Sequence, residues 1–346
     1  MPEIILQLET VTQCPICKST HRETLYDDLV DTYLGVAPNK WHLYRCTNCE
    51  AAYLDPRPTR ETIGEIYAHD YYTHSTTPVS QKGLKAAFLA LRNGWLNRRV
   101  GYRFFPAWSI GYYLFNLFPN AFLTHWIHHA RGLTPPISNS NPPIWLDIGC
   151  GNGEFLSRIQ TAGWLVEGIE PDQQAAHIAK QYGFKIYNET LETTLLQPNY
   201  YDVISLSHVI EHLHDPVAAL QMCYAALKPN GRLWLSTPNL NSFGHQFYKR
   251  YWLHLDVSRH LVLFNQKSLE ISLKQAGFRN IEYLPRGFHV APVYSHSEAS
   301  KMGNIPTVKI SPTFFQRLKW LPQEMRHGIV QPDAEELIIN AYKPLN

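Results

Sequence analysis

The sequence predicts an α/β protein built around a Rossmann-like, seven-stranded and mostly parallel sheet, preceded by a cysteine-rich module and a helical segment. Three observations support this fold. Apolar strand patterns and amphipathic helix patterns alternate from Ile144 onward, which is the order of a parallel sheet covered by helices. A glycine-rich turn follows the first of these strands, and four cysteines form two CxxC pairs near the N-terminus.

The chain of 346 residues is long enough for about two domains. Hydrophobic residues make up 45% of it and charged residues 17%, a composition that is typical of a globular protein and excludes a disordered one. A stretch rich in Pro, Ser and Asn at residues 134–143 predicts a boundary. We therefore expect a zinc-binding module at 1–58, a helical segment at 59–140 and an α/β domain at 141–346.

The elements of the α/β domain follow from its apolar runs and helical periodicity. Strands are expected at residues 144–148, 165–169, 184–187, 202–206 and 232–236. Helices are expected at residues 154–162, 173–182 and 216–227. The run ELIINAY at residues 336–342 predicts the final strand, which we expect to be antiparallel to its neighbours.

The N-terminal module contains Cys14 and Cys17 in one CxxC pair and Cys46 and Cys49 in another, with 28 residues between the two pairs. Four thiolates can hold one tetrahedral zinc ion and leave no open position, so we expect the zinc to be structural. The N-terminus lacks the features of a secretory signal. We therefore expect a cytoplasmic, reducing location, where paired cysteines hold metal more often than they form disulfides.

Two alternatives for this module remain open. The CxxC pairs would hold no metal if they served redox chemistry instead. A zinc ribbon could also bind nucleic acid, but acidic residues offset the few basic ones in the module, which argues against nucleic acid as a partner.

The middle of the chain is strongly basic. The stretch from Tyr71 to Leu146 has no Asp or Glu and seven Lys or Arg residues, which indicates an anionic partner. Apolar residues also follow one helix face there: Leu84, Phe88, Leu91, Trp95 and Tyr102. We expect residues 83–130 to be a lid packed on the α/β domain or an interfacial element at the inner face of a membrane. Pro and Asn interrupt its uncharged run too often for a transmembrane helix.

The glycine-rich turn DIGCGNG, residues 147–153, lies between the first expected strand and helix. Glycines there permit positive φ and let the backbone approach a ligand closely. The dinucleotide fingerprint GxGxxG fails, because the sixth position counted from the first glycine is Glu154, whose carboxylate would also repel a pyrophosphate. Glu170 ends the second strand and can accept hydrogen bonds from the ribose hydroxyls of a cofactor without phosphate.

Several stretches in order, WLDIGCGNGEFL, GWLVEGIEPD, YYDVISLSHVIEHLHDP and LKPNGRLWLSTPN, resemble the class I methyltransferases that use S-adenosylmethionine. The resemblance covers residues 142–278. It implies that the glycine turn holds the methionine part of S-adenosylmethionine, that Glu170 holds the ribose, and that residues after the third and fourth strands lie near adenine and the sulfonium. The implied cofactor residues are Asp147, Gly149, Cys150, Gly151, Gly153, Glu170, Pro171, Thr190, Leu191 and Ser207.

The four-cysteine module, followed by YLDPRPT and by Tyr67, Tyr71 and Tyr72, resembles bacterial methyltransferases of surface-polysaccharide and sugar-modifying pathways. The resemblance implies that Tyr71 and Tyr72 cap the cofactor, with plain aromatic packing as the alternative. It also implies methylation of a small, phosphate-bearing acceptor, such as a sugar of a surface glycan or a nucleotide sugar. A quinone or aromatic O-methyltransferase fits the same core.

Histidines on the acceptor side are the candidates for a general base. Methyl transfer mainly requires a nucleophile held close and aligned, and a hydroxyl acceptor also benefits from a base. We expect His260 first, then His208 and His212, to be catalytic, with structural hydrogen bonding as the alternative for each. The expected substrate-binding residues are Arg259, which suits a phosphate, together with Trp252 and Asn239.

Overall fold

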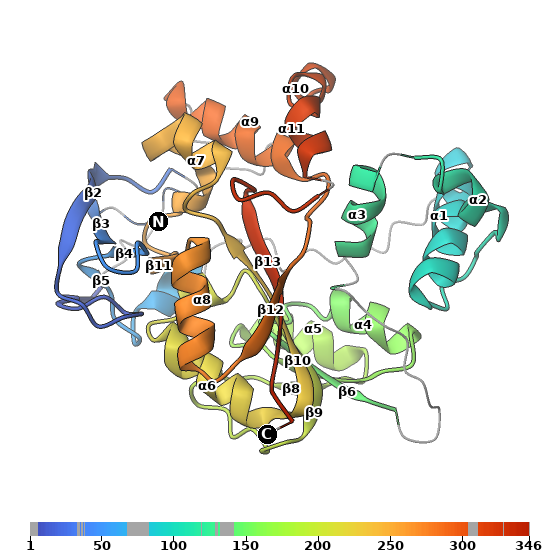
Figure 1. Cartoon of the computed structure of the whole chain (residues 1–346), viewed down its shortest axis with the longest axis horizontal. Helices are drawn as coiled ribbons and strands as arrows, with labels where there is room; N and C mark the ends of the chain where they lie inside the picture. Colours follow the sequence, from blue (N-terminus) through green and yellow to red (C-terminus); the bar gives the residue numbers. More distant parts are fainter. Residues whose placement is uncertain are drawn as a thin grey trace.

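The computed structural model describes residues 6–32, 35, 37, 39–67, 83–118, 120–128, 131, 142–303, 311–327 and 329–345. A central sheet runs through the molecule in Figure 1, with the cysteine-rich part on one side of it and the helices of residues 84–128 on the other.

The central sheet has seven strands in the order β12-β13-β10-β9-β6-β7-β8, which confirms the predicted fold class. Strand β13 is antiparallel to both of its neighbours, and the other pairs are parallel. The strands are β6 (Ile144–Ile148), β7 (Leu165–Ile169), β8 (Lys185–Tyr187), β9 (Tyr201–Ser207), β10 (Leu227–Pro238), β12 (Arg279–Tyr283) and β13 (Glu336–Tyr342). The carboxyl ends of the parallel strands therefore meet at one edge, where open α/β sheets bind their ligands.

Helices cover both faces of this sheet (Figure 1). On one face lie α6 (Pro216–Ala226) and α8 (Gln266–Gln275), and on the other lie α4 (Glu154–Thr161) and α5 (Gln173–Gln181). Asp172 and Asp215 fix where α5 and α6 begin, because each carboxylate accepts a hydrogen bond from the backbone N–H three residues further on.

Further helices lie beyond the carboxyl-end edge, at the top of Figure 1. The α-helices there are α7 (Phe243–Tyr248), α9 (Val290–Lys301), α10 (Phe314–Lys319) and α11 (Leu321–Arg326). Short 3-10 helices connect the elements near this edge: η1 (Ile63–Tyr67), η3 (Ile210–His212), η4 (Lys249–Tyr251) and η5 (Leu253–Leu255).

A second, four-stranded sheet joins the N-terminal module to the α/β domain. Its strands are β11 (Val262–Leu263), β4 (Ala52–Leu54), β3 (Trp41–Cys46) and β2 (Arg22–Leu29), in that order. Val262 pairs with Tyr53, and the Leu54 N–H donates to the carbonyl oxygen of Leu261 at 3.0 Å. Beside this sheet, β1 (Leu8–Glu9) pairs with β5 (Arg57–Pro58). Residues 6–58 thus share a sheet and a buried apolar core with the domain that begins after residue 141.

The helical segment consists of α1 (Leu84–Val100), α2 (Ile110–Phe115) and α3 (Asn120–His128). Trp95 is 1% exposed, and its ring lies 5.8 Å from that of Trp126 on α3. The predicted apolar face of α1 therefore packs largely against its own segment, although Leu84 at its start is exposed. Among the described helices, none combines the length and apolar character needed to cross a membrane.

Candidate active site

The glycine-rich turn connects β6 to α4 with a backbone that suits only glycine. Gly149, Gly151 and Gly153 have φ values of 70°, 55° and 81°, in the left-handed region where a side chain is strained. A Cβ on Gly149 would also lie 2.6 Å from a methyl carbon of Val209. The turn therefore presents bare backbone at the carboxyl end of β6, where the sequence predicts the cofactor.

Glu170 lies directly against this turn. Its Oε2 accepts a hydrogen bond from the Gly151 N–H at 2.8 Å, and its Oε1 accepts one from the Asp172 N–H at 2.9 Å. Burial raises the pKa of the Glu170 carboxyl, and the two backbone donors oppose that rise. The ends of β6 and β7 thus hold together the two features predicted to bind methionine and ribose, and the carboxylate keeps lone pairs for ribose hydroxyls.

Asp147 is buried within β6, and two side chains contact its carboxylate. Ser205 Oγ donates a hydrogen bond to Oδ1 at 2.7 Å, and Arg131 forms an ion pair with the same oxygen. The Arg131 guanidinium also stacks on Phe155, with Cζ 3.6 Å from the ring centroid. Burial raises the pKa of Asp147, and Arg131 opposes that rise. In the sequence analysis, Arg131 is only one of seven basic residues in the stretch without acidic residues. Its ion pair with Asp147 was not predicted, because no local sequence pattern indicates it.

Other predicted cofactor residues lie along the same edge of the sheet. Ser207 is the last residue of β9, and Pro171 follows β7 closely. In the loop after β8, Leu191 is buried whereas Thr190 is exposed. These four residues follow or end β9, β7 and β8, at the edge of the sheet where β6 lies between β9 and β7 and carries the glycine turn, which is the arrangement that the sequence predicts around a bound nucleoside.

Cys150 fills space inside the sheet. It is buried, and its Sγ would lie 2.5 Å from a Cβ on Gly168, so the thiol occupies the gap that this glycine leaves in β7. Burial raises the pKa of the thiol, and it would therefore be a poor nucleophile. Tyr71 and Tyr72 lie outside the described residues, so their capping role stays a prediction.

Buried and half-buried ionisable side chains gather beside Ser207, beyond the carboxyl ends of β9 and β10. His208 is central to them: its Nδ1 lies 3.2 Å from Glu211 Oε1, and its Nε2 lies 3.5 Å from Glu336 Oε1. Burial disfavours the imidazolium, but the two carboxylates outweigh it and raise the pKa of His208 to about 10. His208 is therefore a cation at neutral pH, suited to donate hydrogen bonds rather than to accept a proton.

His212 and His260 face each other in the same group, with ring centroids 4.7 Å apart. Nδ1 of His212 lies 3.0 Å from the carbonyl oxygen of Arg259, and Nδ1 of His260 lies 2.8 Å from that of His254. A carbonyl oxygen only accepts, so the His260 ring carries a proton on Nδ1, and in its neutral form Nε2 is the acceptor. The Tyr67 hydroxyl, which can donate as well as accept, lies 2.8 Å from the same Nδ1 of His212. Burial, and then His260, lower the pKa of His212 to about 4.

Two carboxylates lie near the free nitrogen of His260. Its Nε2 is 3.8 Å from Asp256 Oδ2 and 4.0 Å from Glu211 Oε1. Burial disfavours the charged form of Glu211, but His208 nevertheless holds the pKa of that carboxyl at about 2. The structure thus brings the three predicted catalytic histidines together, with two carboxylates beside Nε2 of His260.

Arg259, predicted to bind a substrate phosphate, is the centre of a buried ion-pair network. Its side chain is 0% exposed. It donates to both carboxylate oxygens of Asp31, at 2.7 and 3.1 Å, and also to Asp256. Because the two carboxylates occupy its guanidinium fork, Arg259 has no exposed surface for a phosphate here. Its position ties the N-terminal module to the loop that carries His260.

The other two predicted substrate-binding residues are buried as well. Trp252 donates from Nε1 to Glu335 Oε2 at 2.9 Å. Asn239 donates from Nδ2 to the carbonyl oxygens of Pro332 and Ala334, at 3.0 and 2.8 Å. Both side chains fasten the loop after β10 to the start of β13, next to Glu336.

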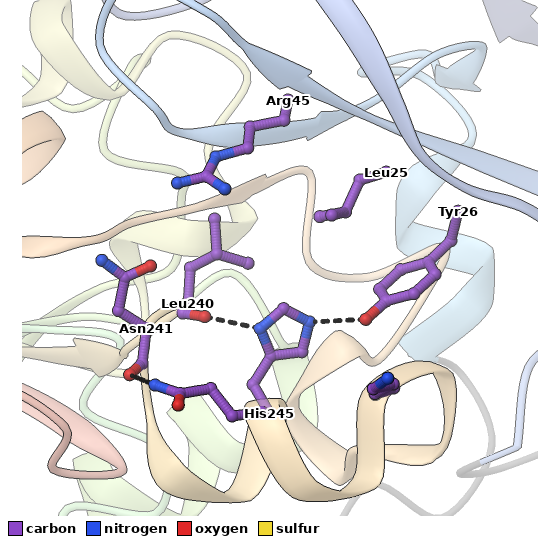
Figure 2. Close-up of a pocket in the computed structure, with 8 residues that line it drawn as sticks. Leu25, Tyr26, Arg45, Leu240, Asn241 and His245 are labelled. Atoms are coloured by element: carbon purple, nitrogen blue, oxygen red, sulfur yellow. Dashed lines mark hydrogen bonds between the residues drawn. The ribbon is translucent and has the colours of Figure 1, made fainter.

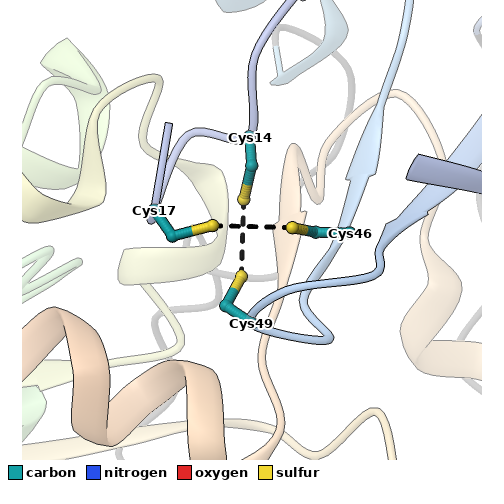
Figure 3. A group of neighbouring side chains, drawn as sticks. All are labelled: Cys14, Cys17, Cys46 and Cys49. Carbon is teal, nitrogen blue, oxygen red and sulfur yellow. Dashed lines mark hydrogen bonds between the residues drawn. The ribbon is translucent and has the colours of Figure 1, made fainter. Parts of the chain in front are cut away.

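The four predicted zinc ligands converge on one point (Figure 3). Cys14 and Cys49 have Sγ atoms 3.5 Å apart, as do Cys17 and Cys46, and all four atoms lie within 4.8 Å of one another. Such distances are too long for disulfide bonds of about 2.0 Å. They approach the edge of about 3.8 Å of a tetrahedron with zinc–sulfur bonds of about 2.3 Å. The thiol set therefore fits a zinc ion.

Two further groups among the described residues combine side chains of metal-ligating types, with ligand atoms within 4.8 Å of one another. They are Glu211, His212 and His260 in the group around His208, and His289, Glu324 and His327 nearby. The oxygens of Glu324 already accept hydrogen bonds from the backbone N–H groups of His289 and Ala291, at 2.7 and 3.0 Å. In the second group, Glu324 therefore caps the N-terminus of helix α9.

Sequence reasoning missed the partners of His208 that come from the end of the chain. Glu336 is the first residue of β13, and Arg286 donates from Nε to its Oε2 at 2.9 Å. His289 Nε2 lies 3.7 Å from the other oxygen of Glu336. One signal was available: an antiparallel final strand begins at the edge where its parallel neighbours end, so its first residue lies among the functional side chains.

Comparison with known proteins places the chain among methyltransferases. The sequence model of a family described as "Methyltransferase domain" matches residues 120–283. The chain is 30% identical over 172 residues to a ubiquinone biosynthesis O-methyltransferase of Bordetella bronchiseptica, covering 44% of this chain and 69% of that protein. It is 37% identical over 105 residues to the enzyme of that name from Haemophilus ducreyi, covering 27% of this chain and 44% of that protein. The matched region thus spans less than half of the latter relative.

Two solved structures to which the chain is similar are described as methyltransferases. One is a SAM-dependent methyltransferase from Archaeoglobus fulgidus, with 19% identity, a TM-score of 0.41, and coverage of 65% of this chain and 92% of that chain. Another is an S-adenosylmethionine-dependent methyltransferase from Mesorhizobium loti, with 12% identity, a TM-score of 0.41, and coverage of 64% of this chain and 98% of that chain.

Proposed function

Since the chain belongs to the class I methyltransferases that use S-adenosylmethionine, we propose that it transfers a methyl group to a small, phosphate-bearing sugar acceptor, in a surface glycan or a nucleotide sugar. The observation that carries this proposal is the polar character of the acceptor side. His208, His212, His260, Glu211 and Glu336 contact one another in a group that follows Ser207 at the carboxyl-end edge of the sheet. A polyhydroxylated acceptor can satisfy such buried donors and acceptors, whereas an apolar one would leave them unpaired.

The residues of the chain divide the work as follows. The glycine turn and Glu170 bind and orient the cofactor, which supplies an activated methyl group on a sulfonium. His208, held as a cation by Glu211 and Glu336, directs both of its ring N–H groups at these carboxylates and supplies a positive charge beside the acceptor. His260 takes the proton from the acceptor hydroxyl at Nε2, and Asp256 and Glu211 stabilise the resulting imidazolium.

Product analysis tests this proposal. The protein is incubated with S-adenosylmethionine carrying a labelled methyl group and with separate pools of nucleotide sugars, lipid-linked glycans and demethylated quinones, and each pool is then analysed by mass spectrometry. We expect label in a sugar-containing pool and a loss of about 100-fold or more in rate for His260→Asn. Label that enters none of the sugar pools would exclude the sugar acceptor.

The curated relatives favour one second candidate. They are named ubiquinone biosynthesis O-methyltransferases, so methylation of a quinone or another aromatic hydroxyl is the alternative. Label that enters the demethylated quinone pool alone would establish this alternative in place of the sugar acceptor.

We also propose that the four cysteines hold a structural zinc ion and that the module does not bind nucleic acid. Two of the basic side chains of the module are paired within it: Arg22 with Asp55 at 2.7 Å, and Lys40 with Asp28 at 3.3 Å. Paired cations leave little positive potential for a phosphate backbone. Gel shifts with RNA and DNA at low salt test this, and salt-dependent retardation would contradict it.

The helical segment supports a peripheral contact with a membrane in a reducing cytoplasm. Apolar side chains on α2 and in the loops beside it are exposed: Phe105, Trp108, Ile110, Tyr113, Leu114, Leu117 and Phe118. Arg98, Arg99 and Arg103, which are also exposed, lie shortly before these residues in the sequence. Apolar side chains flanked by cations suit an anionic bilayer surface. The lid reading remains the alternative, and it draws support from the contact between the rings of His128 on α3 and Trp234 on β10.

A further inference from the structure

A cleft of about 410 Å³ separates the N-terminal sheet from the α/β domain (Figure 2). Its walls come from β2 and β3 on one side and from the loop after β10, helix α7 and Lys249 on the other. The volume lies in the range of small-molecule sites. The cleft is distinct from the glycine turn and from the histidine group, since no residue of either lines it.

The charge in this cleft is entirely positive. Arg45 and Lys249 line it, and none of the lining residues, all within the described ranges, is acidic. Glu50 approaches Arg45 only at 3.5 Å and has a closer partner in Lys267, at 2.8 Å. Among the described residues, the Lys249 ammonium has no ion-pair or hydrogen-bond partner. The backbone of Lys249 has a φ of 52°. Two cations thus line the cavity, and the only carboxylate paired with either of them among the described residues is Glu50, at 3.5 Å from Arg45; this charge suits an anionic ligand.

Neutral polar groups complete the cleft. Nδ1 of His245 donates to the carbonyl oxygen of Leu240 at 2.5 Å, and the Tyr26 hydroxyl donates to Nε2 at 3.0 Å. Burial lowers the pKa of His245, so this pair stays neutral and fixed. Asn241 and Gln246 place amide groups at the same wall. The lining therefore offers cations and neutral donors, with the Tyr26 ring as an apolar surface.

We propose that this cleft binds the diphosphate group of the acceptor, through Arg45 and Lys249. Arg45 can donate two parallel hydrogen bonds to one phosphate, and Lys249 supplies a second charge for its neighbour. The cleft thereby supplies the phosphate site that the buried Arg259 cannot provide. This inference rests on the proposed function in one respect, because it takes the acceptor to carry a diphosphate.

Three successive ring contacts separate the cleft from His208 in the histidine group. Ring contacts lead from one to the other: His245 lies 5.1 Å from Trp252, Trp252 lies 5.3 Å from His254, and His254 lies 6.0 Å from His208. Leu240 in the cleft wall also comes two residues after the end of β10. A carrier diphosphate held in the cleft would therefore lie near the carboxyl end of β10, with these rings between it and the histidine group.

Calorimetry on the full chain tests the proposal with three probes: inorganic pyrophosphate, uridine diphosphate and geranyl diphosphate. We expect pyrophosphate to bind, with an affinity that falls as salt rises. Tighter binding of uridine diphosphate would identify a nucleotide carrier, and tighter binding of geranyl diphosphate would identify a lipid carrier. Absence of heat with all three probes at millimolar concentration would overturn the proposal.

Substitutions place the binding in the cleft. Arg45→Gln should weaken binding about tenfold to a hundredfold, because it removes charge-assisted hydrogen bonds. Lys249→Gly removes the ammonium at a φ that glycine adopts freely, so it should lose affinity without losing melting temperature. Lys274→Gln is the matched control, since Lys274 pairs with Glu270 on α8 at 3.0 Å, outside the cleft. Equal affinity in all three variants would overturn the assignment.

Methyl transfer assays separate this inference from the proposed function. If Arg45→Gln and Lys249→Gly methylate a diphosphate-linked sugar with an unchanged KM, the function stands and the cleft assignment falls. If the variants lose diphosphate binding but the wild-type protein methylates no phosphate-bearing acceptor, the cleft stands and the function falls. A raised KM with an unchanged kcat for both variants would support the two together.

Discussion

His208 and Glu336 meet at one edge of the central sheet, with Nε2 of the imidazole 3.5 Å from Oε1 of the carboxylate, although they lie far apart in the sequence. The contact joins the end of β9 to the start of β13. Glu211 approaches the other ring nitrogen at 3.2 Å. Because both carboxylates are buried, water screens these attractions only weakly. The pair therefore fixes a cation at the place where the acceptor is expected.

The ion pairs of His208 with Glu336 and Glu211 predict that the free energy of unfolding falls as the pH rises above neutral. Since the folded-state pKa of His208 is raised to about 10 from 6.5, its ion pairs contribute full stability below about pH 6.5. That contribution declines above pH 6.5 and is lost as the pH rises through about 10. The free energy of unfolding should fall by on the order of 2–4 kcal/mol between pH 7 and 10. Denaturant unfolding across this range measures the effect.

Glu336→Gln separates this contribution from the rest of the protein. The variant should lower the pKa of His208 by about one unit or more, because it removes one of two buried charges, and NMR titration of the ring would report it. Glu189→Gln, which changes an exposed acid in the loop after β8, should leave the titration unchanged. A His208 that titrates near 6.5 in the wild-type protein would contradict the prediction.

The cofactor site predicts a second outcome. Glu170→Ala should weaken binding of S-adenosylhomocysteine by about 1–3 kcal/mol, because it removes a buried carboxylate that accepts the ribose hydroxyls. Gly149→Ala should also weaken it, since the added methyl group would lie 2.6 Å from Val209 in a strained backbone. Calorimetry measures both. Gly64→Ala, whose added methyl group meets open space, is the control and should bind normally.

Much of the central fold was predictable from local patterns. Strands β6, β7 and β13 have the bounds that their apolar runs predict, and α4 and α5 end one residue before the predicted positions. Glu170 was assigned from its place at the end of a strand. The pattern succeeds here because each of these elements buries a continuous apolar face.

The remaining relationships depend on pairing between distant segments, which leaves no local pattern. Strand β11 has only two residues, yet it joins the N-terminal module to the α/β domain by pairing with β4. Arg259 has a phosphate-binding residue type, but Asp31 reaches it from the module and occupies its guanidinium group. The burial of a cation by a distant partner cannot be inferred from the sequence around that cation.

Because β4 of the N-terminal module and β11 of the α/β domain belong to one sheet, loss of zinc should also destabilise part of the α/β domain. Elemental analysis should find one zinc per chain, and Cys46→Ser should lose it and destabilise the protein, because metal binding contributes folding free energy. Since β4 pairs with β11, the loss should also reduce hydrogen-exchange protection in residues 252–263. Cys150→Ala should retain the zinc. Well under one zinc per chain in the wild-type protein, with freely alkylated cysteines, would exclude the site.

The exposed apolar surface of the helical segment predicts binding to anionic vesicles. Trp108 is 50% exposed and Phe105 is 94% exposed, whereas Trp95, on the face predicted from periodicity, is buried. Insertion of exposed aromatic side chains, aided by nearby arginines, should carry the protein with phosphatidylglycerol vesicles in a flotation assay at low salt. Phosphatidylcholine vesicles should recover much less protein, because they offer no charge attraction.

Trp108→Glu tests which surface makes this contact. It places a negative charge among the apolar side chains near α2, so vesicle recovery should fall several-fold while the melting temperature stays within a few degrees. Phe314→Glu is the matched control, since Phe314 is a 74% exposed aromatic residue on α10, outside the segment. If both variants lose recovery equally, the contact is not specific to the helical segment. If the wild-type protein ignores anionic vesicles altogether, the membrane contact is excluded and the segment acts as a lid.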